Sequence, residues 1–592
     1  MAATVQLKKI PYGEADFSVI RNEGYAFVDK TRFIEVLEAG DTRFPFIVRP
    51  RRFGKSLFTS MLMKYYDKAE AADFDKYFSG TYIGSHKTPS ANQFYVLKLD
   101  FSAVDDSEGL ERGFAFSLWE RLSQFFERYP IPGWKDFLSR NRNTQSPVIL
   151  FQDFVALVRP TTKFGLYLII DEYDQFANEL LSSDPSEFIR ITSSNGFLKK
   201  FYSLLKRCAL AEGSVARIFI TGVTSISLDS MTSGFSIADN FTSDPAFADL
   251  YGFTESELRS FIPQVLDLEK LGLTLDSLVL RMKEWYNGYR FCSDAETTVF
   301  NASMCLYYLK FWTRRSREPD RLLDPSVASD LSKIHGILRL GAPDEAEAIV
   351  SQAIAKKPLL FFPEPETLNL QKNGQLSREG LLTALVYMGY LTYASDSRNS
   401  LVISNRAMAQ QFFDLYFQVL RNMPDWKSSR YDYDVAVTAL NGGDPLPLLR
   451  SIANNLKTNC GIHKSLHLRE SDFQTALLVA ANFAPQFKCS VEVEVTGEGS
   501  GFADVLLQSK NRGPSYLFEL KYLPKGKSEG YAVSSLLDGA VKQLRNYVRG
   551  DNIRTIPHLM SVAAVFSGLE LAAAHVFNTE SGRETRYPEI TA

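Results

Sequence analysis

The stretch Arg49-Pro-Arg-Arg-Phe-Gly-Lys-Ser56 decides the fold of this chain. The apolar run at 44–48 precedes it and predicts a short strand, and the apolar spacing at 56–66 predicts a helix. A strand, a loop and the start of a helix place successive main-chain N–H groups around a phosphate. The stretch therefore predicts a phosphate-binding loop in an α/β fold.

Three residues of this loop have defined roles in such a site. Gly54 lets the backbone approach the ligand, Lys55 neutralises the β- and γ-phosphates, and Ser56 offers its hydroxyl to Mg²⁺. The usual motif, G-x-x-x-x-G-K-[ST], opens with Gly where this chain has Arg49, so a basic surface turn is the alternative. The nucleotide-binding residues predicted here are Arg52, Phe53, Gly54, Lys55, Ser56 and Leu57.

The stretch 166–174 supplies the acidic half of the same site. Its apolar run ends in two carboxylates, which predicts a buried strand that delivers Asp171 to Mg²⁺ and Glu172 to the water that attacks the γ-phosphate. A third strand at 216–222 carries Thr221, a candidate for contacting that water or the γ-phosphate. A core strand with a solvated acidic turn, and an ordinary strand end at Thr221, are the alternatives.

Several stretches of the first 310 or so residues resemble the AAA-ATPase-like family. The resemblance implies a P-loop NTPase parallel sheet with helices, and ATP with Mg²⁺ as cofactors. It also implies that the missing first Gly is a family trait. Asp29 and Lys30 belong to the family's N-terminal signature, and Arg217 and Arg290 are candidates for an arginine finger. The matching stretches are 25–34, 49–57, 170–174, 251–258 and 285–291.

The last 130 or so residues predict a second α/β domain with the element order α, β, β, β, α, β. Glu519 and Lys521 stand at i and i+2 of one strand and therefore share a face. With Asp504 from the adjacent strand, two carboxylates can bind Mg²⁺ while the lysine orients a water for hydrolysis of a phosphodiester. The alternative is a surface hairpin with an ordinary Glu/Lys pair.

This arrangement resembles a PD-(D/E)XK nuclease domain, which has a restriction-endonuclease-like α/β fold. The resemblance implies that Asp504, Glu519 and Lys521 form the core of the site, with Ala503 at the position of the name-giving Pro. It implies that Glu470 helps to hold the metal. It further implies an auxiliary pair at i and i+4 of the second helix, Gln543 and Tyr547.

The chain divides into four predicted regions. These are an ATPase-like P-loop domain at 1–235, its helical lid at 236–310, a mainly helical connecting region at 311–465 and the nuclease-like domain at 466–592. A length of 592 residues exceeds what one hydrophobic core usually supports, which agrees with several domains. The helical apolar spacing at 408–420 predicts a packing face.

Composition narrows the class of protein. A chain with 45% hydrophobic and 23% charged residues is typical of packed globular domains, and a net charge of −3 gives no global attraction to a polyanion. A nucleic-acid site would therefore be local. Candidate positive charges near the second site are Lys525, Lys527, Lys542, Arg545 and Arg549.

The five cysteines have no spacing that suits zinc or a disulfide framework, and His463 and His467 lack an evident third ligand. Neither a signal peptide nor a membrane-spanning stretch is expected, which predicts a cytoplasmic or nuclear protein.

The leading hypothesis is an ATP-binding and ATP-hydrolysing protein that cuts DNA or RNA under nucleotide control. Nucleic acid is then the expected partner, no membrane contact is expected, and homo-oligomerisation is open. The alternative is an ATP-dependent switch whose nuclease-like domain binds nucleic acid or a protein without cleavage. A third reading, in which both sites are inert, is also open.

Overall fold

The computed structural model describes most of the chain. The described ranges are 6–40, 42–102, 104, 109–163, 165–175, 179–180, 184–192, 195–210, 214–224, 237–319, 321–324, 336–354, 358–362, 375–395, 397–415, 430–459, 468–482, 484, 486–511, 513–524, 531–578 and 581–588.

Two compact units make up the structure. Unit 1 comprises Met1–Ala346 together with Leu360–Asn405, and unit 2 comprises Glu347–Leu359 together with Arg406–Ala592. In the described part of the chain, no helix is long and apolar enough to cross a membrane.

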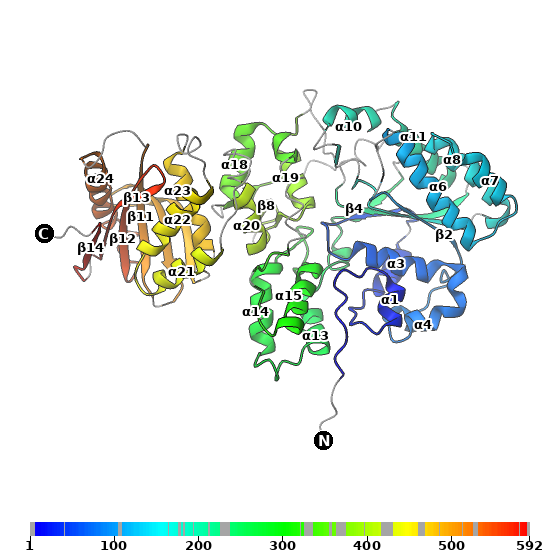
Figure 1. Ribbon diagram of the computed structural model, residues 1–592, viewed down its shortest axis with the longest axis horizontal. Coiled ribbons are helices and arrows are strands. Elements are labelled where there is room, and N and C mark those ends of the chain that lie inside the picture. Colours follow the sequence, from blue (N-terminus) through cyan, green and yellow to red (C-terminus); the bar gives the residue numbers. More distant parts are fainter. Residues whose placement is uncertain are drawn as a thin grey trace, which may run out of the picture. The chain divides into compact units, whose positions relative to one another are not determined.

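Unit 1 contains a five-stranded parallel sheet with the strand order β2-β3-β4-β1-β5 (Figure 1). β1 and β3 are buried along their whole length, as expected for parallel strands covered on both faces. The strands predicted around 44–48, 166–171 and 216–222 are confirmed, whereas β2 and β5 are not predicted from the sequence. The strands are β1 (Pro45–Val48), β2 (Tyr95–Asp100), β3 (Leu166–Asp171), β4 (Val215–Gly222) and β5 (Asp239–Asn240).

Helices cover both faces of this sheet (Figure 1). One face carries α3 (Lys55–Tyr66), which contacts β2 and β3, with α1 (Phe17–Asn22) and α4 (Phe74–Phe78) beside it. The other face carries α6 (Leu110–Arg128), α7 (Trp134–Asn141), α8 (Pro147–Thr162) and α11 (Phe197–Leu210). Because all strands are parallel, the loop after β1 and the acidic pair at the end of β3 lie at the same edge of the sheet.

A second group of helices in unit 1 follows the sheet in sequence. α13 (Glu255–Val265), α14 (Leu275–Tyr286) and α15 (Ala302–Arg315) pack against one another. Thr254 begins α13 with a capping box: its hydroxyl accepts from the Glu257 N–H, and the Glu257 carboxylate accepts from the Thr254 N–H.

The region predicted to be mainly helical also contains strands. α19 (Arg378–Tyr387) is followed by β7 (Leu391–Tyr393) and β8 (Ser400–Ile403), which form an antiparallel pair. Both strands are short runs of apolar, β-branched and aromatic residues, which favour strands over helices. The predicted helix at 408–420 is confirmed as far as it is described, as α20 (Arg406–Leu415).

The remaining elements of unit 1 are short helices, and two further elements span the sequence positions at which the chain passes from one unit to the other. The short elements are α2 (Arg32–Ala39), η1 (Lys68–Asp73), α5 (Tyr82–Ser85), α10 (Pro185–Thr192) and η2 (Pro245–Phe247), and those at the boundary are α18 (Pro343–Ile354) and β6 (Leu359–Leu360).

Unit 2 contains a six-stranded sheet with the order β14-β13-β12-β11-β10-β9. β11 and β12 are parallel and all other neighbours are antiparallel, so α24 serves as the crossover between β11 and β12. The strands are β9 (Phe487–Val495), β10 (Gly501–Ser509), β11 (Ser515–Leu523), β12 (Leu559–Ser567), β13 (Glu570–Asn578) and β14 (Glu584–Tyr587).

The two faces of this sheet are covered by different helices (Figure 1). α24 (Tyr531–Tyr547) buries Ala540 and Leu544 against one face, and α22 (Leu446–Asn459) and α23 (Glu470–Asn482) contact the other. α21 (Arg430–Asn441) packs on α22. The predicted order α, β, β, β, α, β is present from α23 to β12, and β13 and β14 extend it beyond the prediction.

Candidate functional site

The loop after β1 makes a tight turn before α3. Arg52 has φ 69° and Gly54 has φ 103°, both in the left-handed region, and Gly54 is the N-cap of α3. An N-cap in this region favours glycine because other residues are strained there. The turn leaves the N-terminus of the 12-residue helix α3 open toward the loop, as a phosphate site requires.

Arg49, at the position of the usual first Gly, turns away from this helix end. Its side chain is 1% exposed and donates to three main-chain carbonyls: Val48 at 2.8 Å, Thr242 at 2.7 Å and Phe247 at 3.0 Å. Its guanidinium also stacks on Phe291, 4.4 Å from the ring centroid. Arg49 therefore fixes the end of β1 and does not extend as a surface cation.

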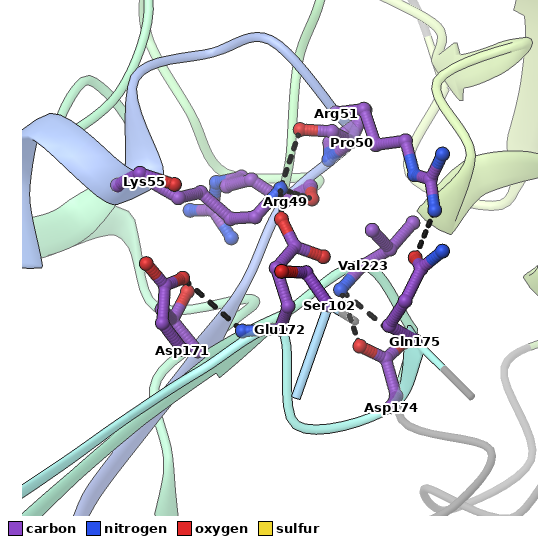
Figure 2. Close-up of polar contacts among 12 residues, drawn as sticks. Arg49, Pro50, Arg51, Lys55, Ser102, Asp171, Glu172, Asp174, Gln175 and Val223 are labelled. Carbon is purple, nitrogen blue, oxygen red and sulfur yellow. Dashed lines mark hydrogen bonds and ion pairs between the residues drawn. The ribbon is translucent and has the colours of Figure 1, made fainter. Parts of the chain in front are cut away.

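Lys55 is held inside the loop. Its side chain is 3% exposed, and Nζ donates to the carbonyls of Arg49 at 3.1 Å and Pro50 at 3.2 Å. Glu172 Oε1 lies 3.8 Å from the same nitrogen, and Figure 2 shows both side chains converging on the loop. The ammonium is thus charge-paired and sits where a phosphate would compete for its protons.

Glu172 directly follows β3 in an unusual backbone conformation. Its φ is 48°, a region that non-glycine residues adopt at a cost, and this turn directs the carboxylate toward Lys55 (Figure 2). Burial raises the pKa of Glu172, and Lys55 opposes that rise. Its Oε2 is buried without a hydrogen-bond partner. This side chain can accept a proton or a metal ion with little rearrangement.

Asp171, the predicted metal ligand, is already engaged on both oxygens. Oδ1 accepts from the Glu172 N–H at 3.1 Å. Oδ2 lies 3.0 Å from Lys98 Nζ and accepts from the Thr59 hydroxyl at 3.0 Å. Lys98 comes from β2, and neither Lys98 nor Thr59 is predicted as a site residue from the sequence.

The remaining predicted residues of this site are placed as follows. Thr221 is fully buried and its hydroxyl donates to the Ile47 carbonyl at 2.7 Å, so it joins β4 to β1. Arg217 lies 6.0 Å from the Phe94 ring centroid, and the Arg290 guanidinium donates to the Ala295 carbonyl at 2.7 Å. Neither arginine lines the cavity beside the loop.

That cavity has a volume of about 330 Å³. Its wall includes 52–58 of the loop and α3, together with Glu172. Other parts of the wall are apolar. They include side chains from α1, α13 and α15, namely Ile20, Phe261 and Leu306. A polar wall at a helix N-terminus and an apolar wall beside it suit a phosphorylated ligand with an apolar or aromatic group.

Asp29 and Lys30 tie the segment before α2 to its surroundings. Asp29 accepts from the Thr31 N–H at 2.9 Å and from the Tyr82 N–H at 2.6 Å. Lys30, which is 8% exposed and lines the cavity, donates to Glu257 Oε2 at 2.7 Å. Since Glu257 completes the capping box of α13, Lys30 connects the cavity wall to that helix.

The chain is similar to known proteins. Residues 11–232 match the model of a family described as predicted AAA-ATPase. This match covers less than half of the chain, so the similarity to the family concerns the N-terminal region. An uncharacterized protein in the vnfD 5′ region of Azotobacter chroococcum mcd 1 is 27% identical over 303 residues, 50% of this chain and 51% of that protein. The chain therefore spans about half the length of this curated relative.

A solved structure is also similar to the chain. The Walker-type ATPase PABY2304 of Pyrococcus abyssi aligns with 65% of this chain and 96% of its own, with 13% identity and a TM-score of 0.38.

The second predicted site, around Asp504, Glu519 and Lys521, lies in unit 2. Asp504 stands on β10, where its Oδ1 accepts from Gln474 Nε2 at 2.8 Å and its Oδ2 from the Leu520 N–H at 2.6 Å. Burial raises the pKa of Asp504 to about 6. Gln474 is not predicted as a site residue from the sequence, although it stands four residues after Glu470, and both lie on α23.

Glu519 and Lys521 share a face of β11, as predicted. Lys521 Nζ lies 2.9 Å from Glu519 Oε1 and 3.5 Å from Glu470 Oε1. Burial, followed by the neighbouring charge of Asp504, raises the pKa of Glu519 to about 7. Glu519 Oε2 is buried without a hydrogen-bond partner. The structure thus brings together Glu470, Asp504, Glu519 and Lys521.

The auxiliary pair lies on α24. Tyr547 is 6% exposed and lies against Gly501, and Gln543 is exposed. Burial, followed by the charge of Glu519, raises the pKa of Tyr547. A Cβ at Gly501 would stand 2.7 Å from the Tyr547 ring.

The predicted positive charges are only partly described. Arg545 pairs with Glu584 at 3.1 Å. Lys542 and Arg545 on α24, and Arg549 just after it, are exposed and line a shallow groove with Asp538. Lys525, Lys527, His463 and His467 lie outside the described residues.

A metal ion at either site would depend on few protein ligands. Among the residues that the structure describes, no group of three or more His, Cys, Asp or Glu side chains is arranged to hold a metal ion. Mg²⁺ commonly binds through one or two carboxylates, substrate oxygens and water. The unpartnered oxygens of Glu172 and Glu519 fit that requirement, because each offers a free carboxylate oxygen at its site.

Proposed function

We propose that this protein binds ATP in the cavity beside the loop at 49–56 and hydrolyses it. The observation that carries the proposal is the geometry of the loop: the open N-terminus of α3, with Lys55 and Glu172 3.8 Å apart beside it. The phosphates would lie on main-chain N–H groups of Gly54, Lys55 and Ser56, where the helix dipole favours negative charge.

In the proposed reaction, Lys55 leaves the carbonyls of Arg49 and Pro50 and pairs with the β- and γ-phosphates. Glu172 takes a proton from the attacking water, and its raised pKa makes it a stronger base than a solvated glutamate. Ser56, which lines the cavity, and Asp171 are the groups that would hold Mg²⁺, as the sequence predicts. Bound Mg²⁺ would supply charge stabilisation for the phosphoryl group.

Nucleotide binding tests the first half of the proposal. Lys55→Ala is expected to weaken ATP binding by at least about tenfold, because it removes a buried cation that contacts phosphate. Glu172→Gln is expected to keep ATP affinity and lose hydrolysis. The matched control is Lys76→Ala, since Lys76 is exposed on α4. Titration calorimetry and phosphate release measure the two effects, and equal ATP affinity in the Lys55 and Lys76 variants would refute the proposal.

We further propose that unit 2 carries a nuclease-fold domain with a restriction-endonuclease-like arrangement, which cuts DNA or RNA when a metal ion is bound. The proposal is supported by Asp504, Glu519 and Lys521 meeting at the β10 and β11 strands, with raised pKa values for both acids. Lys521 would orient the attacking water, while Glu519 and Asp504 would hold the metal with help from Glu470. Mg²⁺ would polarise the scissile phosphate.

Cleavage of labelled DNA and RNA tests this second half. Lys521→Ala and Glu519→Gln are expected to reduce cleavage by about a hundredfold or more, as for removal of a group that acts on the reacting water. Lys488→Ala is the control, since Lys488 is an exposed lysine of β9. Cleavage with and without ATP measures nucleotide control, and wild-type cleavage rates in the Lys521 variant would refute the assigned site.

A second candidate function is an ATP-dependent switch whose unit 2 binds nucleic acid or a protein without cleavage. It is favoured by one observation: both oxygens of Asp504 are already bonded within the protein, to Gln474 and to the Leu520 N–H. A binding domain would retain affinity for labelled nucleic acid in Mg²⁺ and leave it intact.

A further inference from the structure

A second cavity of unit 1 lies behind the phosphate-binding loop. It has a volume of about 490 Å³. Its wall includes 48–50, which Arg51 separates from the stretch 52–58 that lines the first cavity, together with the segment 291–293 and residues of α19. A volume of this size holds a small organic molecule.

Arg49 gives this cavity a positive wall. Its side chain is fully buried, and among the described residues its contacts are with carbonyl oxygens and the Phe291 ring and none is with a carboxylate. Nε is buried without a hydrogen-bond partner. A buried cation that lacks a counter-ion is costly, so an anion beside it would be favourable.

Aromatic rings form much of the remaining wall. Phe291, Phe361, Tyr387 and Tyr393 all line the cavity. Flat rings stack on such side chains with centroids a few ångströms apart. The other charged groups at the wall are paired: Glu379 lies 3.5 Å from Arg378, and Arg398 lies 2.9 Å from Asp294.

The loop joins this cavity directly to the nucleotide site. The carbonyls of Arg49 and Pro50 accept from Lys55 Nζ, so the same two residues contribute to the second cavity and hold the lysine of the first. Pro50 also packs against Gly389, where a Cβ would stand 2.9 Å from the proline ring. A ligand that moves Arg49 or Pro50 would change the acceptors available to Lys55.

We propose that this second cavity binds a small aromatic anion, a carboxylate or phosphate on a planar ring, and that its occupancy is coupled to nucleotide binding at the loop. The proposal that the cavity binds an aromatic anion depends only on the cavity and its lining residues. The proposal that this binding is coupled to nucleotide binding rests on the proposed ATP site.

Alkylation of Cys292 tests the binding part, because this buried thiol lines the cavity. Native full-length protein is treated with iodoacetamide, and peptide mass spectrometry compares Cys292 with the half-buried Cys489 of unit 2. Three probes of similar shape are added: benzoate, phenyl phosphate and neutral benzamide. Benzoate or phenyl phosphate is expected to protect Cys292 at about tenfold lower concentration than benzamide, without protecting Cys489.

The two anionic probes distinguish a carboxylate ligand from a phosphate ligand. Equal protection by benzamide would refute an anion site. Absence of Cys292 labelling under conditions that label Cys489 would refute an accessible cavity.

Substitutions of two residues that line the cavity, Arg49 and Thr383, test whether the ligand binds there. Arg49→Met is expected to remove the preference for benzoate over benzamide. Because Arg49 also supports the fold, Thr383→Trp provides a second variant, which fills the cavity from α19 without touching Arg49. Thr383→Ser is its control. Calorimetric benzoate affinity is expected to fall at least about tenfold in Thr383→Trp and to be unchanged in Thr383→Ser, and unchanged affinity in Thr383→Trp would overturn the proposal.

The Kd for ATP with and without saturating benzoate tests the coupling. A change of about fivefold is expected, and reciprocity requires the same change in benzoate affinity when ATP is added. An unchanged Kd for ATP refutes the coupling. Benzoate binding in a protein that binds no ATP refutes the proposed nucleotide site and supports the cavity assignment.

Discussion

At the scale of single residues, a sequence motif does not determine which partners a side chain contacts, as Arg49 and Asp171 illustrate. The motif at 49–56 places Arg49 where a glycine is usual, and its side chain turns into the protein and bonds to carbonyls of β1 and of the segment after β5. Asp171 stands at the predicted end of a buried strand, yet its partner Lys98 comes from the neighbouring β2. Strand order depends on long-range packing, so this pair could not be predicted from the sequence.

Lys98→Met is expected to destabilise unit 1 by about 2–4 kcal/mol, because it leaves the 1% exposed Asp171 as a buried carboxylate without its cation. Urea unfolding measures the loss. Lys98→Arg should retain most of the stability, and adding Asp171→Asn to Lys98→Met should restore much of it. A double variant as unstable as the sum of the two single variants would contradict the pairing.

The free energy of unfolding of unit 2 should depend on pH in a way that reports the raised pKa of Glu519. The pKa of Glu519 is raised by burial to about 7 from a usual 4.5, so between these values the folded state holds a proton that the unfolded state has released. Stability is then greatest below about pH 4.5 and falls as the pH rises through 7, by about 1–3 kcal/mol. Thermal unfolding of unit 2 in EDTA measures this slope.

Glu519→Gln serves as the control for the pH series. The amide cannot ionise, so its variant should be more stable relative to wild type at pH 8 than at pH 4.5. The same relative stability at both pH values would show that Glu519 has an ordinary pKa.

At the scale of elements, prediction from the sequence worked where a motif and an apolar run coincide. β1, β3 and the helix α3 were predictable because apolar runs flank the loop or end in acids, and β4 because it is itself an apolar run ending in Thr-Gly. β5 has only two residues and β7 only three, which is too short for a periodic signal. In unit 2, α23 to β12 follow the prediction, whereas β13 and β14 were missed, although β13 is an alanine-rich apolar run.

Gly288, which follows α14, lies in close backbone contact with Ser404, which follows β8. Its φ is 95°, and a Cβ at this position would stand 2.0 Å from the Ser404 carbonyl oxygen. Gly288→Ala is therefore expected to cost about 2–4 kcal/mol of unit 1 stability, through both the left-handed backbone and the clash.

The matched control for this substitution is Gly272→Ala. Gly272 also has a positive φ, 65°, but a Cβ there meets nothing within 4 Å, so the cost should be only about 1 kcal/mol. Urea unfolding of the two variants separates the steric cost from the backbone cost, and equal losses would contradict the contact with Ser404.

At the scale of the whole molecule, two units with their own sheets and cores carry the two candidate sites. The loop at 49–56 lies in unit 1 and the cluster of Asp504, Glu519 and Lys521 lies in unit 2. Both candidate sites are predictions from sequence motifs: the loop after β1 and the acids after β3 each carry a motif of their own, and Asp504, Glu519 and Lys521 stand on the adjacent strands β10 and β11. The motifs gave no information on the cavity behind the loop, because its wall combines residues from 48 to 399.

Separate cores predict two unfolding transitions, of which ATP should shift one. Four of the five tryptophans, at 119, 134, 285 and 312, fall within unit 1, so tryptophan fluorescence follows mainly that unit while calorimetry detects both. ATP with Mg²⁺ at a hundred times its Kd should stabilise unit 1 by about 2.7 kcal/mol and raise its Tm by roughly 3–5 °C. Lys55→Ala should abolish this shift without moving the transition of unit 2. Since ligand stabilises only the unit that binds it, an equal ATP shift of both transitions would mean that the two units unfold together.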